Sequence, residues 1–428
     1  NVGRSYVLRM IIRRAARFGK GLGFTGPFLG QVAQVVVQEM SFFFDELGER
    51  HGHILRTITA EEKRFQRTLD TALTYLDEVL DELAAGDGTV IQGATAFDLY
   101  ATYGLPLEIT RDVAEERGYT VDGVGFKAAS EAHRLSSGAG SIGPIDSAEQ
   151  GRYSDLMETL VAGGLLTREG VDHDPYSSLT LETRVLAISV EGEPVEVAEP
   201  GAEVEVVLAA TPLYVESGGQ VSDTGEVQSC SDARDSWRIE VTDVHIPLTG
   251  LIVHRGRVAE GRPCIGARSQ VLVDADRRWD IMRNHTATHL LHHELRRVLG
   301  DHVLQQGSLV APDRLRFDFN HPAMLTQEEL STIGGNVIRA IRRNYPVIVG
   351  HTSLEDAKGR GAMALFGEKY GDVVRTIEIG NPADRYSLEL CGGTHVKGTA
   401  EIGSFRIISE GSVGANLRRV EAVTGRRL

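Results

Sequence analysis

Apolar residues recur at helical spacing in the first part of the chain. Between residues 55 and 85 they fall at Phe65, Leu69, Leu73, Leu76, Leu80 and Leu83. Side chains three and four positions apart share one face of an α-helix, so this pattern predicts one long helix that ends at Gly86-Asp87-Gly88. Similar patterns predict helices over 4–18, 110–118 and 122–137, and the Gly- and Ser-rich stretch from Ser136 to Ser147 predicts a loop or linker. Residues 1–175 are therefore expected to form a mainly helical domain.

The pattern changes after residue 175. Residues 184–275 alternate between apolar and polar positions, as in Trp237-Arg238-Ile239-Glu240-Val241, and Gly or Pro interrupts these runs. Such short, regularly interrupted runs predict a small antiparallel β-barrel over residues 176–275. Residues 276–428 mix helical patterns (281–299 and 326–343) with strand-like segments near 346–350, 373–379 and 402–408. The predicted fold class is therefore multidomain α+β.

Composition limits the class of protein. The chain has 428 residues, 41% of them hydrophobic and 25% charged, which is ordinary for a globular protein of more than one domain. No apolar run approaches the roughly 20 residues that cross a bilayer, so no membrane partner and a cytoplasmic location are predicted. The three cysteines, Cys230, Cys264 and Cys391, are too scattered for a disulfide framework, which fits a reducing compartment.

Charge is distributed unevenly along the chain. The net charge of −15 argues against a nucleic-acid partner, yet residues 1–38 contain six Arg or Lys residues and no acid. Within the first predicted helix, Arg9, Arg13 and Arg17 recur every four residues and share one face. This basic face indicates contact with phosphates, and a merely solvated arginine face is the alternative.

Two pairs of residues have the spacing of metal ligands. His285 and His289 are four residues apart in a helical pattern, so both imidazoles leave the same face, and Cys391 and His395 flank two glycines that allow a tight turn. One thiolate and three imidazoles suit tetrahedral Zn²⁺. The histidine pair alone is weak evidence, because a chance pair on a helix surface is several times commoner than a metal site, and His292 lies near the same face. With both pairs, a metal site and a chance arrangement are about equal alternatives.

The residue between the histidines limits the chemistry. A zinc peptidase of the His-Glu-x-x-His type has a general-base glutamate directly after its first histidine, where this chain has Thr286. A metallopeptidase is therefore disfavoured. If all four side chains bind zinc, no position is left for a water molecule, and the ion would shape a pocket instead of generating hydroxide.

With these residues the chain resembles the bacterial alanyl-tRNA synthetase family over nearly its whole length. The motifs that carry the resemblance are Asn1-Val2-Gly3-Arg4-Ser5-Tyr6-Val7-Leu8-Arg9, Glu216-Ser217-Gly218-Gly219-Gln220, His285-Thr286-Ala287-Thr288-His289, Gln305-Gln306-Gly307-Ser308-Leu309-Val310 and Cys391-Gly392-Gly393-Thr394-His395. The resemblance implies a helical tRNA-recognition domain (1–175), a linking β-barrel (176–275) and a zinc-containing editing domain (276–428). It also implies that the class II aminoacylation core, which would bind ATP and alanine, and a C-terminal coiled coil are absent from this chain.

The resemblance implies an activity as well. An alanine-binding site cannot exclude the smaller glycine sterically and rejects serine only weakly, so such enzymes hydrolyse Ser-tRNA(Ala) and Gly-tRNA(Ala) in a second site. The expected residues of that site are Thr288 as a hydroxyl-binding group, Gln305 for the substrate carbonyl or a water, and Ser217, Gly218 and Gly219 for the tRNA 3′ end. An alternative from another class is a tRNA(Ala)-binding module whose zinc is structural and which is catalytically silent.

The family's tRNA-reading residues match only in part. Asn1 corresponds to an asparagine that reads the acceptor stem, and Arg4, Arg9, Arg13 and Arg17 are the expected phosphate contacts. Where relatives carry an aspartate, the segment Tyr100-Ala101-Thr102-Tyr103-Gly104 has Ala101, which lacks a side-chain acceptor. Two-sided reading of the acceptor G·U pair is therefore not expected to operate through this position.

Overall fold

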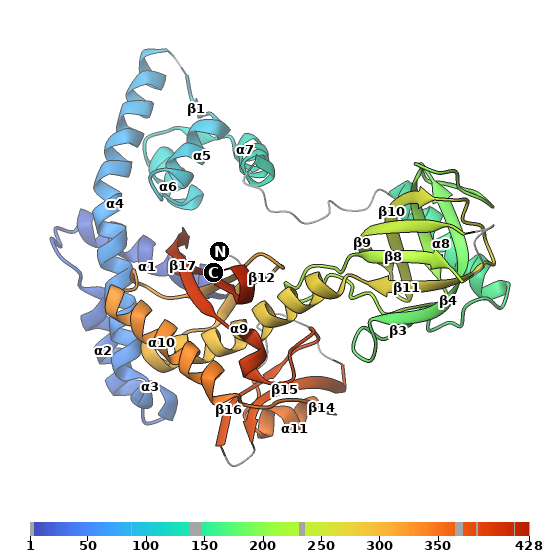
Figure 1. Ribbon diagram of the computed structural model, residues 1–428. Helices are drawn as coiled ribbons and strands as arrows, with labels where there is room; N and C mark the ends of the chain where they lie inside the picture. The colour runs from blue at the N-terminus through green and yellow to red at the C-terminus, as the bar shows by residue number, and fades with distance from the viewer. Residues whose placement is uncertain are drawn as a thin grey trace. The chain divides into compact units, whose positions relative to one another are not determined.

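The computed structural model describes residues 4–86, 88–136, 147–230, 236–363, 371–381, 384–414 and 416–427. The chain divides into two compact units, Asn1–Gly143 and Pro144–Leu428 (Figure 1). Among the described helices, none combines the length and the apolar character that crossing a membrane requires.

The first unit is built almost entirely from helices. Its elements are α1 (Arg4–Gly21), α2 (Leu29–Met40), α3 (Asp45–Glu49), α4 (His51–Ala85), β1 (Val90–Ile91), α5 (Gly93–Ala101), α6 (Leu107–Glu116), β2 (Thr120–Val121) and α7 (Gly123–Ser136). The predicted helices over 4–18, 55–85, 110–118 and 122–137 are confirmed as α1, α4, α6 and α7. Most of the predicted linker from Ser136 to Ser147 lies outside the described residues.

The long helix α4 organises this unit. Phe65, Leu69 and Leu76 are buried on one of its faces, as their spacing predicted, and pack in a core with α5 and α6. The polar side of α4 forms hydrogen bonds with the start of α2. The buried carboxylate of Glu62 accepts hydrogen bonds from the amides of Phe28 (2.8 Å) and Leu29 (2.9 Å), which are orphan donors at the start of α2.

The second unit begins with α8 and a barrel. Its elements are α8 (Ser147–Ala162), β3 (Asp172–His173), β4 (Thr180–Val190), β5 (Glu193–Pro194), β6 (Glu203–Leu208), β7 (Ala210–Thr211), β8 (Gly225–Ser229), β9 (Arg238–Leu248), β10 (Leu251–Glu260) and β11 (Arg268–Val273). Six described strands follow the order β11-β8-β9-β10-β6-β4, and pairing of β11 with β4 closes the sheet. All six pairings are antiparallel, so the predicted barrel is confirmed.

The alternation seen in the sequence fills the barrel. Ile239 and Val241 of β9 are buried while Glu240 between them is exposed. Tyr153 of α8 is also buried in this core, so α8 packs on the barrel. The division of the sequence into domains at residues 175 and 275 stays a prediction. Along the chain, the boundary between the two compact units falls between Gly143 and Pro144.

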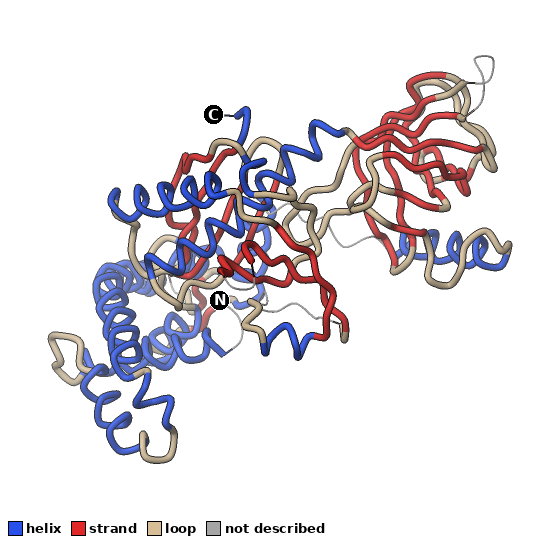
Figure 2. The backbone as a smooth tube through the Cα atoms, turned by 60° about the horizontal axis from the view of Figure 1, so that its bottom comes forward, coloured by secondary structure: helices blue, strands red, loops and turns tan. Residues whose placement is uncertain are grey.

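The rest of the second unit is α+β, as predicted. Its elements are α9 (Ala275–Leu299), β12 (Gln305–Val310), β13 (Leu315–Asn320), α10 (Gln327–Arg343), β14 (Val347–Ser353), α11 (Leu354–Gly359), β15 (Val373–Asn381), β16 (Asp384–Leu390), β17 (Phe405–Gly414), β18 (Leu417–Thr424) and two 3₁₀ turns (Thr399–Ile402 and Gly425–Arg427). The strands form two antiparallel sheets, β12-β13-β18-β17 and β14-β15-β16, which appear in red in Figure 2. Their apolar faces share one core with α9 and α10.

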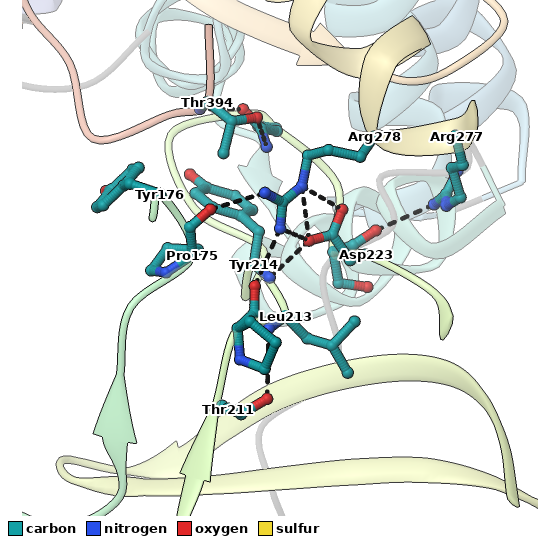
Figure 3. Close-up of polar contacts among 12 residues, drawn as sticks. Pro175, Tyr176, Thr211, Leu213, Tyr214, Asp223, Arg277, Arg278 and Thr394 are labelled. Carbon is teal, nitrogen blue, oxygen red and sulfur yellow. Dashed lines mark hydrogen bonds and ion pairs between the residues drawn. The ribbon is translucent and has the colours of Figure 1, made fainter. Parts of the chain in front are cut away.

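A buried ion pair fixes α9 to the barrel segment before β8. The guanidinium of Arg278 is bonded to the carboxylate of Asp223, and it also donates to the carbonyl oxygens of Pro175 (2.7 Å) and Pro212 (3.0 Å) (Figure 3). The Asp223 carboxylate in turn accepts the amide of Tyr214 at 2.6 Å. Arg278 and Asp223 are only 3% and 1% exposed. Water therefore hardly reaches either charge, and each is stabilised mainly by the other.

We expect Asp223→Ala to lower the free energy of unfolding by about 3–5 kcal/mol, because it leaves a buried guanidinium without its counter-charge. Urea unfolding of the full chain measures this. The matched control is Glu199→Ala, which breaks the exposed Arg262–Glu199 pair and should cost about 0–1 kcal/mol. Equal losses in the two variants would contradict the role given to the buried pair.

Candidate metal centre

The four predicted ligands converge at one point. His285 and His289 lie one turn apart on α9 with their rings stacked, 5.4 Å between centroids, and Cys391 and His395 lie on the turn after β16. One potential ligand atom from each of the four residues lies within 4.8 Å of the others. Folding therefore brings the His285–His289 pair and the Cys391–His395 pair together, whereas their spacing alone did not decide between a metal site and chance.

The donor atoms point at one another. Cys391 Sγ lies 3.3 Å from His285 Nε2 and 3.4 Å from His395 Nε2. His289 Nε2 is buried and has no hydrogen-bond partner among the described residues. A buried nitrogen without a partner is costly, and a cation held by all four side chains would satisfy it. One sulfur and three imidazole nitrogens fit Zn²⁺.

Each imidazole is held through its other nitrogen. The Nδ1 atoms lie 2.6 Å from Gln220 Oε1 for His285, 2.6 Å from Glu389 Oε2 for His289, and 3.2 Å from Thr286 Oγ1 for His395. An acceptor at Nδ1 places the ring proton there and leaves the Nε2 lone pair for a metal. The three rings are therefore oriented as metal-bound histidines usually are.

The electrostatics of the site favour a cation. Burial alone would raise the pKa of the Cys391 thiol, but His285 and His395 hold it well below its usual value. Burial alone would lower the pKa of His289, but the neighbouring Glu389 carboxylate raises it to about 10. Glu389 stays ionised because His289 and His292 hold its pKa down against the effect of burial. A thiolate and a carboxylate thus lie together in a buried site.

The turn that carries Cys391 is tightly held. A Cβ atom on Gly393 would lie 1.9 Å from His285 Cε1, so only glycine fits there. Arg375 Nη1 donates to the carbonyl oxygens of Cys391 (2.7 Å) and Gly393 (2.9 Å), and the Tyr176 hydroxyl donates to that of Gly392 (2.6 Å). These contacts fix the backbone of residues 391–393 and with it the position of the sulfur.

A cavity of about 270 Å³ adjoins the centre. Ser217, Gly218, Thr288 and Gln305 line it together with His285, His289 and Cys391, whereas Gly219 is not part of the lining. The Thr288 hydroxyl donates to the Asn284 carbonyl (2.8 Å), so toward a ligand it is an acceptor. The structure brings four of the five expected pocket residues together, and their substrate roles stay predictions.

The expected tRNA-binding residues lie in the first unit. Asn1 is outside the described residues, and only the backbone of Arg4 is described. Arg9 and Arg13 form ion pairs with the buried Glu61, and Arg17 pairs with Glu116. These contacts give the arginines a structural role, and their contact with phosphates stays a prediction.

The sequence reasoning gave no role to three residues that support the centre, Gln220, Glu389 and Arg375. The only local signal for Glu389 is that it is a charged residue between Leu388 and Leu390, directly before the Cys391 motif. Gln220 and Arg375 act through contacts across 65 and 16 residues, respectively, which no local pattern encodes.

The chain was compared with known families and proteins. Residues 1–277 match the family model described as "tRNA synthetases class II (A)", and residues 374–421 match "Threonyl and Alanyl tRNA synthetase second additional domain". It is similar to alanine–tRNA ligases of Desulforamulus reducens (44% identical over 99% of this chain) and Granulibacter bethesdensis (42% over 99%). The alignments cover 47% of each relative, so the chain spans about half the length of these relatives.

These matches correct two expectations. The class II part was expected to be absent, and this is wrong because residues 1–277 match the class II model. The assignment of the chain to hydrolysis of Ser-tRNA(Ala) and Gly-tRNA(Ala) is also wrong, since the match is to the class II synthetase part and the relatives are named ligases. The short motifs around the metal centre therefore do not define the activity of the chain. The chain belongs to the family of class II (A) tRNA synthetases.

Proposed function

We propose that the protein that carries this chain is an alanine–tRNA ligase, which uses ATP to attach alanine to tRNA(Ala). One observation carries this proposal: curated alanine–tRNA ligases are 44% identical to the chain over 99% of its length. The ester product is formed by the protein as a whole, of which this chain corresponds to about half of the relatives' length.

We also propose that this chain holds a zinc ion. His285, His289, Cys391 and His395 would hold one zinc ion, and the ion, when bound, would supply a fixed tetrahedral centre with no open position. The chain's own residues then shape the adjoining cavity, because His285, His289 and Cys391 form part of its wall. The role of this centre is to order the cavity and not to activate a water molecule.

The metal proposal is supported by the surroundings of the ligands. Each histidine has an oxygen at Nδ1, which favours a ring proton on that atom, and the lowered pKa of the Cys391 thiol favours the thiolate that binds a metal. The Nε2 atoms of His285 and His395 both face Cys391 Sγ. The buried His289 Nε2 has no hydrogen-bond partner among the described residues, and a cation at this point would satisfy it.

The proposed activity is tested by charging. The complete protein, supplied with ATP and radiolabelled alanine, should attach alanine to tRNA(Ala), and omission of ATP should abolish the product. Labelled serine and glycine with the same tRNA serve as controls. Absence of alanyl-tRNA, or equal charging with all three amino acids, would overturn the proposal.

The zinc site is tested by metal analysis. After dialysis, the native chain should retain about one zinc ion, and Cys391→Ala should lose it because the only sulfur ligand is gone. Cys230→Ala is the matched control, since this exposed cysteine lies outside the centre and its variant should retain the ion. Full zinc content in Cys391→Ala would contradict the proposed ligand set.

A further inference from the structure

One side chain of the barrel segment contacts both halves of the metal centre. Gln220 is fully buried, and its Oε1 accepts from His285 Nδ1 (2.6 Å) and from the amide of Thr394 (2.9 Å). Its Nε2 donates to Thr394 Oγ1 at 3.0 Å. The amide therefore joins a ligand on α9 to the turn between the ligands Cys391 and His395.

The backbone of Gln220 is itself fixed. Gln220 and Ser217 exchange two backbone hydrogen bonds (3.0 and 3.2 Å), which close the glycine turn between them. The residues on both sides of Gln220 pair with Val310 at the end of β12. The Val310 amide donates to the Gly219 carbonyl (2.7 Å), and the Val221 amide donates to the Val310 carbonyl (3.1 Å). Three residues later, Asp223 is held by Arg278 (Figure 3).

We propose that Gln220 is a positioning residue of the zinc centre, which sets the ring orientation and tautomer of His285 and the seating of the Cys391–His395 turn. This inference rests on the zinc centre proposed above. An acceptor 2.6 Å from Nδ1 keeps the proton on that atom, so that the Nε2 lone pair faces Cys391. The same oxygen also accepts the Thr394 amide, so a shift of the barrel segment would move both halves of the ligand set.

Glu389 performs the corresponding task for His289 but lies close to the centre in sequence, on the strand that ends just before Cys391. Gln220 differs because it comes from the segment that leads into β8 of the barrel. Through Gln220, the zinc affinity depends on the position of that segment relative to α9. A carboxamide is suited to the position since it accepts twice and donates once without adding a charge to a buried site.

The experiment measures zinc affinity by competition with a chromophoric chelator. Absorption spectra of the Co²⁺-substituted protein report the d–d and sulfur-to-metal bands as a second readout. Gln220→Leu keeps the side-chain size but removes every polar contact, so zinc should bind about 10–100-fold more weakly and the Co²⁺ bands should change. Gln220→Glu retains an acceptor for His285 and should bind zinc more tightly than Gln220→Leu, with Co²⁺ bands closer to those of the native chain. Gln228→Leu is the matched control, since it removes a barrel amide that donates to Gln270 (3.2 Å) away from the centre.

The outcomes separate the two proposals. If the native chain binds no zinc, the zinc centre itself is refuted. If the native chain binds zinc and Gln220→Leu binds it equally well with unchanged Co²⁺ bands, the role of Gln220 is refuted. Should Gln220→Leu fail to fold by circular dichroism, Gln220→Asn replaces it, because the shorter amide cannot reach His285 and should also weaken zinc binding at least about tenfold.

Discussion

Helix α9 carries buried polar groups along its length, and several of them bond to partners from other parts of the chain. Near its start, Arg278 requires the carboxylate of Asp223, and near its end Glu294 accepts from Tyr386 (2.5 Å) and Asn336 (2.9 Å). Between these points lie the two histidines of the metal centre. Since an unpaired buried polar group costs about 1–3 kcal/mol, and a charge more, these contacts hold the barrel segment, the sheet β14-β15-β16 and α10 against α9.

Much of the fold follows from local patterns. The apolar spacing in α4 and the alternation in β9 were sufficient to predict a helix and a barrel strand, because each periodicity has one structural solution that buries its apolar face. The packing of α8 on the barrel could not be predicted, since its apolar residues fit any helical core and only tertiary contact shows which core they join. The identity of the four ligands was predictable, but the oxygens that orient them were not, because these contacts span up to 109 residues.

The family assignment changes what the metal centre means. A zinc ion with four side-chain ligands has no free position for chemistry, so the motifs around it specify a structure more strongly than they specify a reaction. The ligase function proposed for the whole protein and the ordering function proposed for the centre are compatible, because neither requires the zinc ion to take part in the reaction. The buried Gln220 contacts join α9 and the Cys391–His395 turn to the segment that leads to β8.

The four converging side chains should saturate a zinc ion with one sulfur and three nitrogens. X-ray absorption at the zinc K-edge of the zinc-loaded protein tests it directly. The arrangement of His285, His289, Cys391 and His395 predicts one sulfur at about 2.3 Å, three nitrogens at about 2.0–2.1 Å and four-coordinate geometry. A first shell without sulfur, or a five- or six-coordinate ion with bound water, would contradict it.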